Sequence, residues 1–440
     1  ATIGHLPPPL AQTNLPEGMA RLESLLDEYS TADGLDPARR DRLITGIRAE
    51  AQGTGVEADL GMDENTSAAE AITRIDAFVC DIKESQYGEG LHVFGTGQCG
   101  SEELAGLITA LEGRAVAPGP SGSPYRGRDD VMPTGRNLFT TDPRAVPSRA
   151  AQAQGVKLAE ELLRRHLQDH GDWPKGLVID LWGSATMRTA GEEFAMALHL
   201  AGLAPKWDDN SERVSGFEVI PLALLGRPRI DDYSEDARQA AGEAWLNASS
   251  HAIDAKGDIA PARAELESRL ATADSFVHLQ DLPETDLLVA SDYAAHEAGF
   301  AAAMARIGQP TPALYHMDAT RPDKPQARSL GEEIARVTRA RAANPDWATS
   351  MMNHGFRGAA EISATLDHMA AFAHLAQVVQ PHLFDLYFEA TLGRDDLVEF
   401  MERENPEALQ AMRDRFRALQ DAGLWATRRN SIIAALEGAA

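Results

Sequence analysis

Cysteine and long apolar runs are scarce in this sequence. Cys80 and Cys99 are the only cysteines among 440 residues, and they do not form a C-x-x-C pair. This excludes a disulfide framework and favours a reducing compartment. No apolar run approaches the roughly 18 residues that a membrane helix requires, and no basic region followed by an apolar core marks a signal peptide. We therefore expect a cytoplasmic protein with no membrane partner.

Basic residues are also few, and this limits the possible partners. The chain has 41 Lys and Arg against 67 Asp and Glu, which gives a formal net charge of −26. Binding to a phosphate backbone requires clustered cations, so nucleic acid is excluded as the main partner. A length of 440 residues and a hydrophobic content of 43% indicate a globular protein with more than one domain.

Several catalytic motifs are missing. The sequence has no H-E-x-x-H, no zinc-type spacing, no G-x-S-x-G and no G-x-x-x-x-G-K-[ST], so this chain carries no Walker-type ATP site. Gly95, Gly97 and Gly100 do form a G-x-G-x-x-G. A dinucleotide fold would continue into a second strand with an acidic end, but here a segment rich in Pro and Gly follows. These glycines therefore predict a tight turn from a strand to a helix.

Periodicity along the chain predicts a mixed α/β fold. We expect helices over 17–32, 36–53, 67–88 and 151–171, one helix over 184–202, and an all-helical C-terminal region. Strands are expected over 91–94, 175–183, 217–231, 274–281 and 312–319, with a parallel sheet. The predicted division is a helical segment with a strand-loop-helix (1–115), an Arg/Pro/Gly-rich functional loop and helix (116–165), an α/β core (166–330) and the helical region (331–440).

Three histidines hold similar positions in this pattern. His92, His278 and His316 each lie in an apolar run just before a polar loop. The carboxyl ends of strands border the binding crevice of an open sheet, so the three could converge as bases or metal ligands. The alternative is that each is a half-buried strand histidine bonded to the backbone. The arginine-bearing loop over residues 114–150 also has two interpretations. It is either a solvated linker or a binding loop.

Long blocks of the sequence resemble the CobN/magnesium chelatase family, the large porphyrinoid-binding subunits of metal chelatases. They include "MPTGRNLFTTDPRAVPSRAA", "LWGSATMRTAGEEFAMALHLAG", "PLALLGRPRID" and "ALYHMDATRPDKPQARSLGEEIARVTRARAANPDW". The blocks "ATIGHLPPPL" and "CDIKESQYGEGLHVFG" are closer to the C-terminal half of the aerobic cobaltochelatase large subunit. The resemblance covers essentially the whole chain. Family members are longer, however, and a segment of the family pattern is expected to be missing near residues 231–233.

The resemblance implies a chemistry. An ATP-dependent cobaltochelatase inserts Co2+ into hydrogenobyrinic acid a,c-diamide in aerobic cobalamin biosynthesis. Co2+ would be a substrate, no cofactor would be permanently bound, and AAA+-type partner subunits would hydrolyse ATP with Mg2+. One alternative is a magnesium chelatase large subunit acting on protoporphyrin IX. Another is a truncated, non-catalytic homologue that binds a tetrapyrrole or a metal.

This reaction requires three kinds of side chain. Removal of ring N–H protons requires a base, for which the candidates are His92, His316, Asp318 and Glu84. Transient Co2+ ligands could come from His5, His251 and His278. Carboxylates on the ring edge would bind arginine forks, with Arg126, Arg136, Arg188, Arg227 and Arg321 as candidates. Trp182 could lie against the ring face, or it could be a packed strand aromatic.

Overall fold

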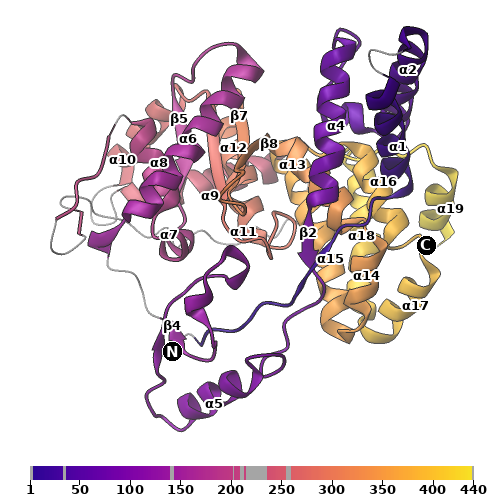
Figure 1. The fold of residues 1–440 in the computed structure, drawn as a ribbon. Helices are drawn as coiled ribbons and strands as arrows, with labels where there is room; N and C mark the ends of the chain where they lie inside the picture. Colours follow the sequence, from indigo (N-terminus) through magenta and orange to yellow (C-terminus); the bar gives the residue numbers. More distant parts are fainter. Residues whose placement is uncertain are drawn as a thin grey trace.

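The computed structural model describes residues 3–32, 36–138, 143–201, 203–208, 213–214, 235–253 and 259–438 (Figure 1). The strand predicted over 217–231, Arg227 within it, and the positions near 231–233 lie outside the described residues. The side chain of His251 is not described either, although its backbone belongs to α9 (Glu235–Ile253). The predictions for these positions therefore stay predictions.

The α/β core contains a four-stranded sheet with the order β5-β6-β7-β8. Its strands are β5 (Leu177–Asp180), β6 (Ser275–Gln280), β7 (Ala313–Asp318) and β8 (Gln326–Ser329). The first three pair in parallel and β8 pairs antiparallel with β7. The predicted parallel core is therefore confirmed, whereas the edge strand β8 was not predicted.

The two faces of this sheet are covered differently. One face of β6 and β7 packs against α6 (Arg149–His170) and α8 (Glu192–Leu200). The strand residues on this face are Val277, Leu279, Tyr315 and Met317. Phe276 and Leu314 join the larger core on the other face, which includes α12 (Gly299–Arg306). Strand side chains alternate, so His278, Gln280, His316 and Asp318 face the same way as Phe276 and Leu314. This face is apolar where the strands begin and polar at their carboxyl ends.

The first helices form where their sequences predict them. They are α1 (Glu17–Ala32), α2 (Pro37–Gly53), the short α3 (Val56–Asp59) and α4 (Ala68–Glu84). The side chain of Asp36 caps α2 by accepting from the Arg39 N–H, and Ser67 caps α4 by accepting from the Glu70 N–H. The apolar faces of these helices pack into the larger core. At the start of the chain, β1 (Leu10–Gln12) pairs antiparallel with β2 (Gln86–Gly88), directly after α4.

The glycine-rich stretch is a turn, as predicted, but no strand precedes it. Residues 91–93 have no regular secondary structure, so the predicted strand over 91–94 is wrong. Gly95 has φ +80°, and a Cβ on Gly100 would lie 2.6 Å from the Gly95 carbonyl oxygen. Only glycines permit this approach, which starts α5 (Gly100–Leu111).

In its described parts, 112–138 and 143–148, the segment after α5 is loop with short 3-10 turns. Its β3 (Pro118–Gly119) and β4 (Asn137–Leu138) pair in parallel, and the Gly4 N–H donates to the Arg136 carbonyl. Figure 1 shows α5 and β4 set apart from the C-terminal helices, with the N-terminus beside β4. The first residues and this loop therefore form one wall, although they are far apart in sequence.

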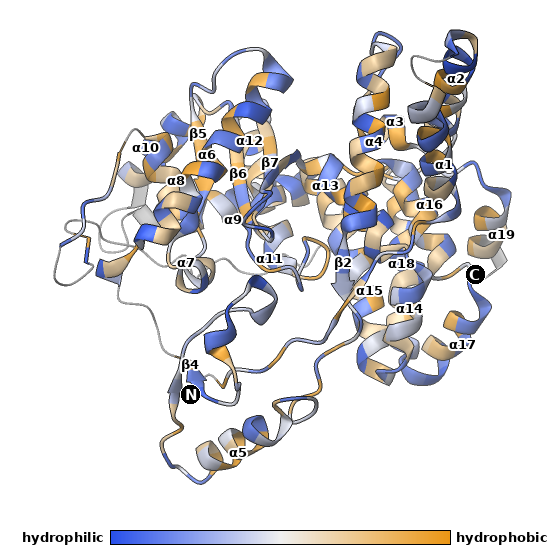
Figure 2. Ribbon diagram, viewed as in Figure 1, coloured by the Kyte–Doolittle hydropathy of each residue, from blue (hydrophilic) through white to orange (hydrophobic). Residues whose placement is uncertain are grey.

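The C-terminal region is helical, as predicted. After β8 it contains α13 (Leu330–Val337), α14 (Pro345–Met352), α15 (Gly355–Ala371), α16 (Pro381–Ala390), α17 (Asp395–Glu404), α18 (Pro406–Asp421) and α19 (Asn430–Gly438). Figure 2 shows that hydrophobic residues recur along these helices and along β6 and β7. The remaining helices of the core are α10 (Ile259–Leu270) and the one-turn α11 (Ser291–Tyr293).

The single helix predicted over 184–202 is two helices. Ala190 has φ 55° and Gly191 has φ 95°, and these left-handed residues separate α7 (Gly183–Thr189) from α8. Glu193 at the start of α8 bonds back to the hydroxyls of Thr186 and Thr189. Those bonds join the end of α7 to the start of α8 across the turn.

Glu193 gives a testable pH dependence. Burial raises the pKa of Glu193 to about 7, against an ordinary value of 4.5. The folded state thus holds a proton that the unfolded state releases, so stability should fall as pH rises from 4.5 to about 7. We expect Glu193→Gln to remove this slope and to be more stable than the wild type by about 3 kcal/mol at pH 8. Urea denaturation at pH 5 and pH 8 measures the free energy of unfolding of both proteins. An equal change with pH in the wild type and in Glu193→Gln would contradict the prediction.

Candidate active site

A cavity of about 480 Å³ lies between the N-terminal wall and the C-terminal helices. Residues from both ends of the sequence line it, including His5, His92, Arg136, Arg188 and Arg341. Its size is in the range of small-molecule sites, roughly 300–1,000 Å³. We call it the histidine cavity. It brings together four residues that the sequence predicts as site residues and one that it does not.

Two histidines form one side of the histidine cavity. The rings of His5 and His92 are stacked with centroids 4.6 Å apart. On the protein side, Nε2 of His92 lies 3.3 Å from Oε2 of the fully buried Glu103. Burial, followed by the neighbouring His92, lowers the pKa of His5. A neutral imidazole and an imidazole beside a carboxylate therefore face the same space.

Glu103 is held as an anion. Burial alone would raise its pKa, but hydrogen bonds from the Leu6 N–H, the Gly95 N–H and the Thr134 hydroxyl hold the pKa of Glu103 below its ordinary value. The glycine-rich turn thus has a structural role here, because its first glycine donates to the carboxylate behind His92. Sequence reasoning missed Glu103, which carries no motif of its own.

Arginines line the same cavity. Arg188, from α7, forms a fork with Asp281 through contacts of 2.7 and 2.8 Å. Arg136 is held instead by backbone carbonyls, those of Asp130, Met132 and Pro133. Within the described part of the chain, Arg136 therefore has no carboxylate partner, and its charge is available to a ligand in the cavity.

A second cavity of about 300 Å³ shares Gln86, Pro283, Asp286 and Arg341 with the first. We call it the acidic cavity after its carboxylates Asp81, Glu84 and Asp318, although cations line it as well, namely Arg321, Lys324, Arg328, Arg336 and Arg341. The two cavities are neighbours through their shared residues. Two predicted bases, Glu84 and Asp318, therefore belong to a different space from His92.

Neither carboxylate is tuned to accept a proton near neutral pH. Hydrogen bonds from Arg321 and Lys324 lower the pKa of Glu84. Burial alone would raise the pKa of Asp318, but the charges of Arg328 and Arg336 hold it far below its ordinary value. Their predicted role as general bases is therefore not supported on physical grounds, and both are better described as ion-pair partners.

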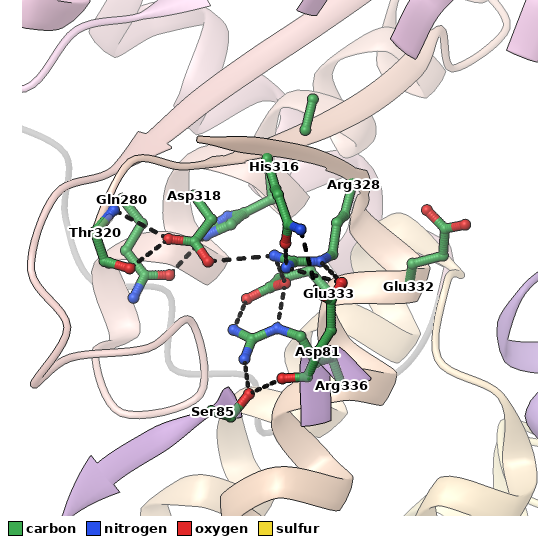
Figure 3. Close-up of polar contacts among 12 residues, drawn as sticks. Asp81, Ser85, Gln280, His316, Asp318, Thr320, Arg328, Glu332, Glu333 and Arg336 are labelled. Carbon is green, nitrogen blue, oxygen red and sulfur yellow. Dashed lines mark hydrogen bonds and ion pairs between the residues drawn. The ribbon is translucent and has the colours of Figure 1, made fainter. Parts of the chain in front are cut away.

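Arg328, on β8, is the centre of an ion-pair network beside the acidic cavity (Figure 3). Its guanidinium lies 3.1 Å from Asp81 on α4, 3.3 Å from Asp318 on β7 and 3.1 Å from Glu333 on α13. Arg336 adds a fork to Glu333 and donates to the Ser85 hydroxyl at 2.6 Å. The network joins the sheet edge to the N-terminal and C-terminal helices.

His278 and His316 do lie side by side at the sheet, as predicted, but both are buried. They are register partners on β6 and β7. Oε1 of Glu297 lies 3.0 Å from Nδ1 of His278 and 2.9 Å from Nδ1 of His316. Nε2 of His316 lies 2.9 Å from Oε1 of Gln280. Burial alone would lower the pKa of His316, but the Glu297 carboxylate raises it.

This burial changes the interpretation of both histidines. Neither lines the two cavities, so the structure does not place His316 or His278 with His92 and His5. Glu297 belongs to a π-helical turn at Ala294–Ala298 that no sequence pattern predicted. Among the described residues, no group of three or more His, Cys, Asp or Glu side chains is arranged to hold a metal ion. His5 lines the histidine cavity and His278 does not, so the structure does not bring these two predicted ligands together.

Trp182 is a packed aromatic, the second of the two interpretations of this residue. Its ring lies 4.6 Å from that of His278 and 5.0 Å from that of His296, and its Nε1 donates to Asp180 at 3.2 Å. Asp180 in turn lies 2.9 Å from Nδ1 of His296. Trp182 does not line either cavity, so the prediction that it lies against a bound ring is not supported.

Two further predicted arginines have internal partners. Arg126 is buried, with its guanidinium 3.1 Å from Glu192 and 3.2 Å from the Ala319 carbonyl. Arg321 is half-exposed and lies 2.7 Å from Glu84. Arg126 serves to fix the loop to the core, whereas Arg321 lines the acidic cavity.

The chain matches one protein family over most of its length. The model of the CobN/Magnesium Chelatase family matches residues 1–100, 96–233 and 236–432. The protein therefore belongs to this family. In the described part of the chain, no helix is long and apolar enough to cross a membrane.

Particular relatives are cobalt and magnesium chelatase subunits. The aerobic cobaltochelatase subunit CobN of Sinorhizobium sp is 30% identical, with 99% of this chain and 51% of the relative covered. A magnesium-chelatase subunit of Rhodobacter capsulatus is 26% identical, with 100% and 44% covered. The solved catalytic subunit of cobaltochelatase from Mycobacterium tuberculosis matches with a TM-score of 0.83 and 26% identity, over 99% of this chain and 52% of that one. The chain thus spans about half the length of the relatives it matches.

Proposed function

We propose that this chain is the substrate-binding and catalytic part of a cobaltochelatase large subunit, which inserts Co2+ into hydrogenobyrinic acid a,c-diamide. The observation that carries the proposal is the histidine cavity, where His5 and His92 face the same space as Arg136 and Arg188. Family membership and the similarity to CobN proteins support it. ATP and Mg2+ would be bound by AAA+-type partner subunits.

The chemistry follows from the two sides of the cavity. His92 takes a proton from a ring nitrogen as Co2+ binds, and the anion of Glu103 stabilises the imidazolium that forms. His5, whose pKa is lowered, remains a neutral imidazole that can hold Co2+ and release it to the ring. On the other side, arginines bind the peripheral carboxylates and orient the macrocycle.

The cavity arginines favour a ligand with carboxylates on its edge, and hydrogenobyrinic acid a,c-diamide carries more of them than protoporphyrin IX does. Arg136, Arg188 and Arg341 all line the histidine cavity. Fluorescence quenching of the purified chain by hydrogenobyrinic acid a,c-diamide and by protoporphyrin IX compares the two substrates. Tighter binding of protoporphyrin IX would favour the magnesium chelatase alternative. The alternative of a non-catalytic role is tested by assaying this polypeptide with ATPase partners in the absence of any full-length large subunit. Insertion of Co2+ under these conditions would exclude a non-catalytic role.

Arg136→Ala tests the binding side of the cavity. We expect it to weaken binding of the carboxylated ring by roughly tenfold, because a charge-assisted hydrogen bond is lost. The affinity from fluorescence quenching is the measurement. Arg114→Ala is the matched control, since Arg114 is exposed, pairs with Glu112 and does not line either cavity. Equal affinities of the wild type and Arg136→Ala would remove this loop from the binding site.

A further inference from the structure

Arg341 lies where the histidine cavity and the acidic cavity meet. It belongs to the π-helical turn at Thr338–Ala342 that follows α13, and it lines both cavities. Its side chain is only 3% exposed. A buried guanidinium costs free energy unless its charge and its hydrogen bonds are satisfied. The contacts of Arg341 therefore show what it is placed to do.

Three contacts fix the plane of this guanidinium. Nε and Nη2 form a fork with the two carboxylate oxygens of Asp286, and the Nη2 contact is 2.9 Å. The ring of Trp347 lies 4.6 Å below the guanidinium carbon. The fork uses the Nε–Nη2 edge, which leaves the opposite edge, formed by Nη1 and Nη2, to point elsewhere.

One atom of this second edge, Nη1, is unsatisfied. Nη1 of Arg341 is buried and has no hydrogen-bond partner in the described part of the chain. Leaving a buried charged donor unpaired costs more free energy than leaving a neutral donor unpaired. Because the residue lines both cavities, a ligand that enters them can supply the missing acceptor.

The same short loop holds two cavity arginines. Asp281 and Asp286 lie at the ends of residues 281–286, directly after β6; Asp281 forks with Arg188 and Asp286 with Arg341. At the end of β6, the side-chain amide of Gln280 donates to two carbonyls of this loop, those of Leu282 and Thr285, at 3.0 and 2.6 Å. The two guanidinium groups are thus set in place before any ligand arrives, which lowers the entropy cost of binding.

We propose that the free edge of Arg341, formed by Nη1 and Nη2, binds a carboxylate of the ligand at the junction of the two cavities. A carboxylate has the planar, two-oxygen geometry and the charge that this edge requires, whereas an ester or amide lacks the charge. The identity of the ring that bears this carboxylate rests on the proposed function. The role of Arg341 is to discriminate ligands that carry a free acid at this position.

The test compares an acid with its ester. Hydrogenobyrinic acid a,c-diamide and its methyl ester, with every free acid esterified, are titrated into the whole chain, and the affinities are read from fluorescence quenching. We expect the wild type to prefer the acid. Arg341→Lys should weaken binding of the acid by roughly 10- to 100-fold and leave that of the ester nearly unchanged, because lysine keeps the charge beside Asp286 but loses the fork.

Arg339→Lys is the matched control. Arg339 is on the same turn, is 4% exposed and donates from Nε and Nη2 to Oδ2 of Asp59, but it does not line either cavity. It should keep the acid preference. Asp286→Asn is a second variant, which keeps Arg341 but loosens its fork and should reduce the preference by a smaller factor. A full acid preference in both Arg341→Lys and Asp286→Asn would overturn the role of Arg341 alone. Binding of neither the acid nor the ester by the wild type would overturn the proposed function, and the carboxylate assignment with it.

Discussion

Replacing His92 by alanine should lower the rate of Co2+ insertion by roughly 10²- to 10⁴-fold, the range in which a general base acts. Affinity for the ring should change much less, because His92 faces the ring nitrogens in this proposal while arginines bind the ring edge. Single-turnover insertion with ATPase partners, followed by the absorbance of the product, gives the rate. Fluorescence quenching gives the affinity.

Three further variants separate the roles on this side of the cavity. Glu103→Gln should slow insertion less than His92→Ala does, since the amide can still contact the imidazole but cannot stabilise its charge. His5→Ala should raise the Co2+ concentration that gives half the maximal rate. His199→Ala is the control, because His199 is a histidine of α8 that does not line either cavity. Equal losses of rate and affinity in His92→Ala would contradict a role for His92 as base.

The sequence predicts more of the fold than of the site. Apolar periodicity predicts β6 and β7 and most of the helices, because burial of one face produces that pattern. It also predicts one helix where Ala190 and Gly191 divide two. Across the division Glu193 bonds to Thr186 and Thr189, and a contact of that kind leaves no periodic signal.

His92 was predicted as a site residue on the basis of a strand that does not form. The sequence places it on a strand, but the structure places it in an irregular segment beside the glycine turn. Its position in the cavity comes instead from Glu103 and from stacking on His5. These residues lie far apart in the chain or carry no motif, so only the tertiary structure reveals their association.

His316 shows the opposite case. Its strand and its neighbour His278 are predicted correctly, yet its burial between Glu297 and Gln280 keeps it away from both cavities. Gln280 in turn holds the loop that positions Arg188 and Arg341. We therefore interpret His316 as a positioning residue for the arginine side of the site. The period-two alternation of polar residues at 278, 280, 316 and 318 was the signal that these side chains share one face.

The largest loss of stability is expected from Arg328→Met. Arg328 is buried among Asp81, Asp318 and Glu333, so its removal leaves three carboxylates without this cation. Breaking a buried ion pair in this way typically costs about 3–5 kcal/mol. The shift of the urea midpoint measures the loss. Arg321→Met is the matched control on the same cavity: its pair with Glu84 is 45% and 47% exposed, and such pairs contribute about 1 kcal/mol or less.

The pH dependence of this loss follows from Asp318. In the wild type, Arg328 and Arg336 overcome the effect of burial and lower the pKa of Asp318 below its ordinary value of 3.8. A lowered carboxyl pKa contributes stability above the unfolded value, and this contribution disappears as pH falls through the folded value. The difference between the wild type and Arg328→Met should therefore be larger at pH 7.5 than at pH 3.5, where protonation begins to relieve the uncompensated carboxylates of the variant. A difference that is equal at both pH values would contradict the ion-pair explanation and would indicate that Arg328 stabilises the sheet edge through packing alone.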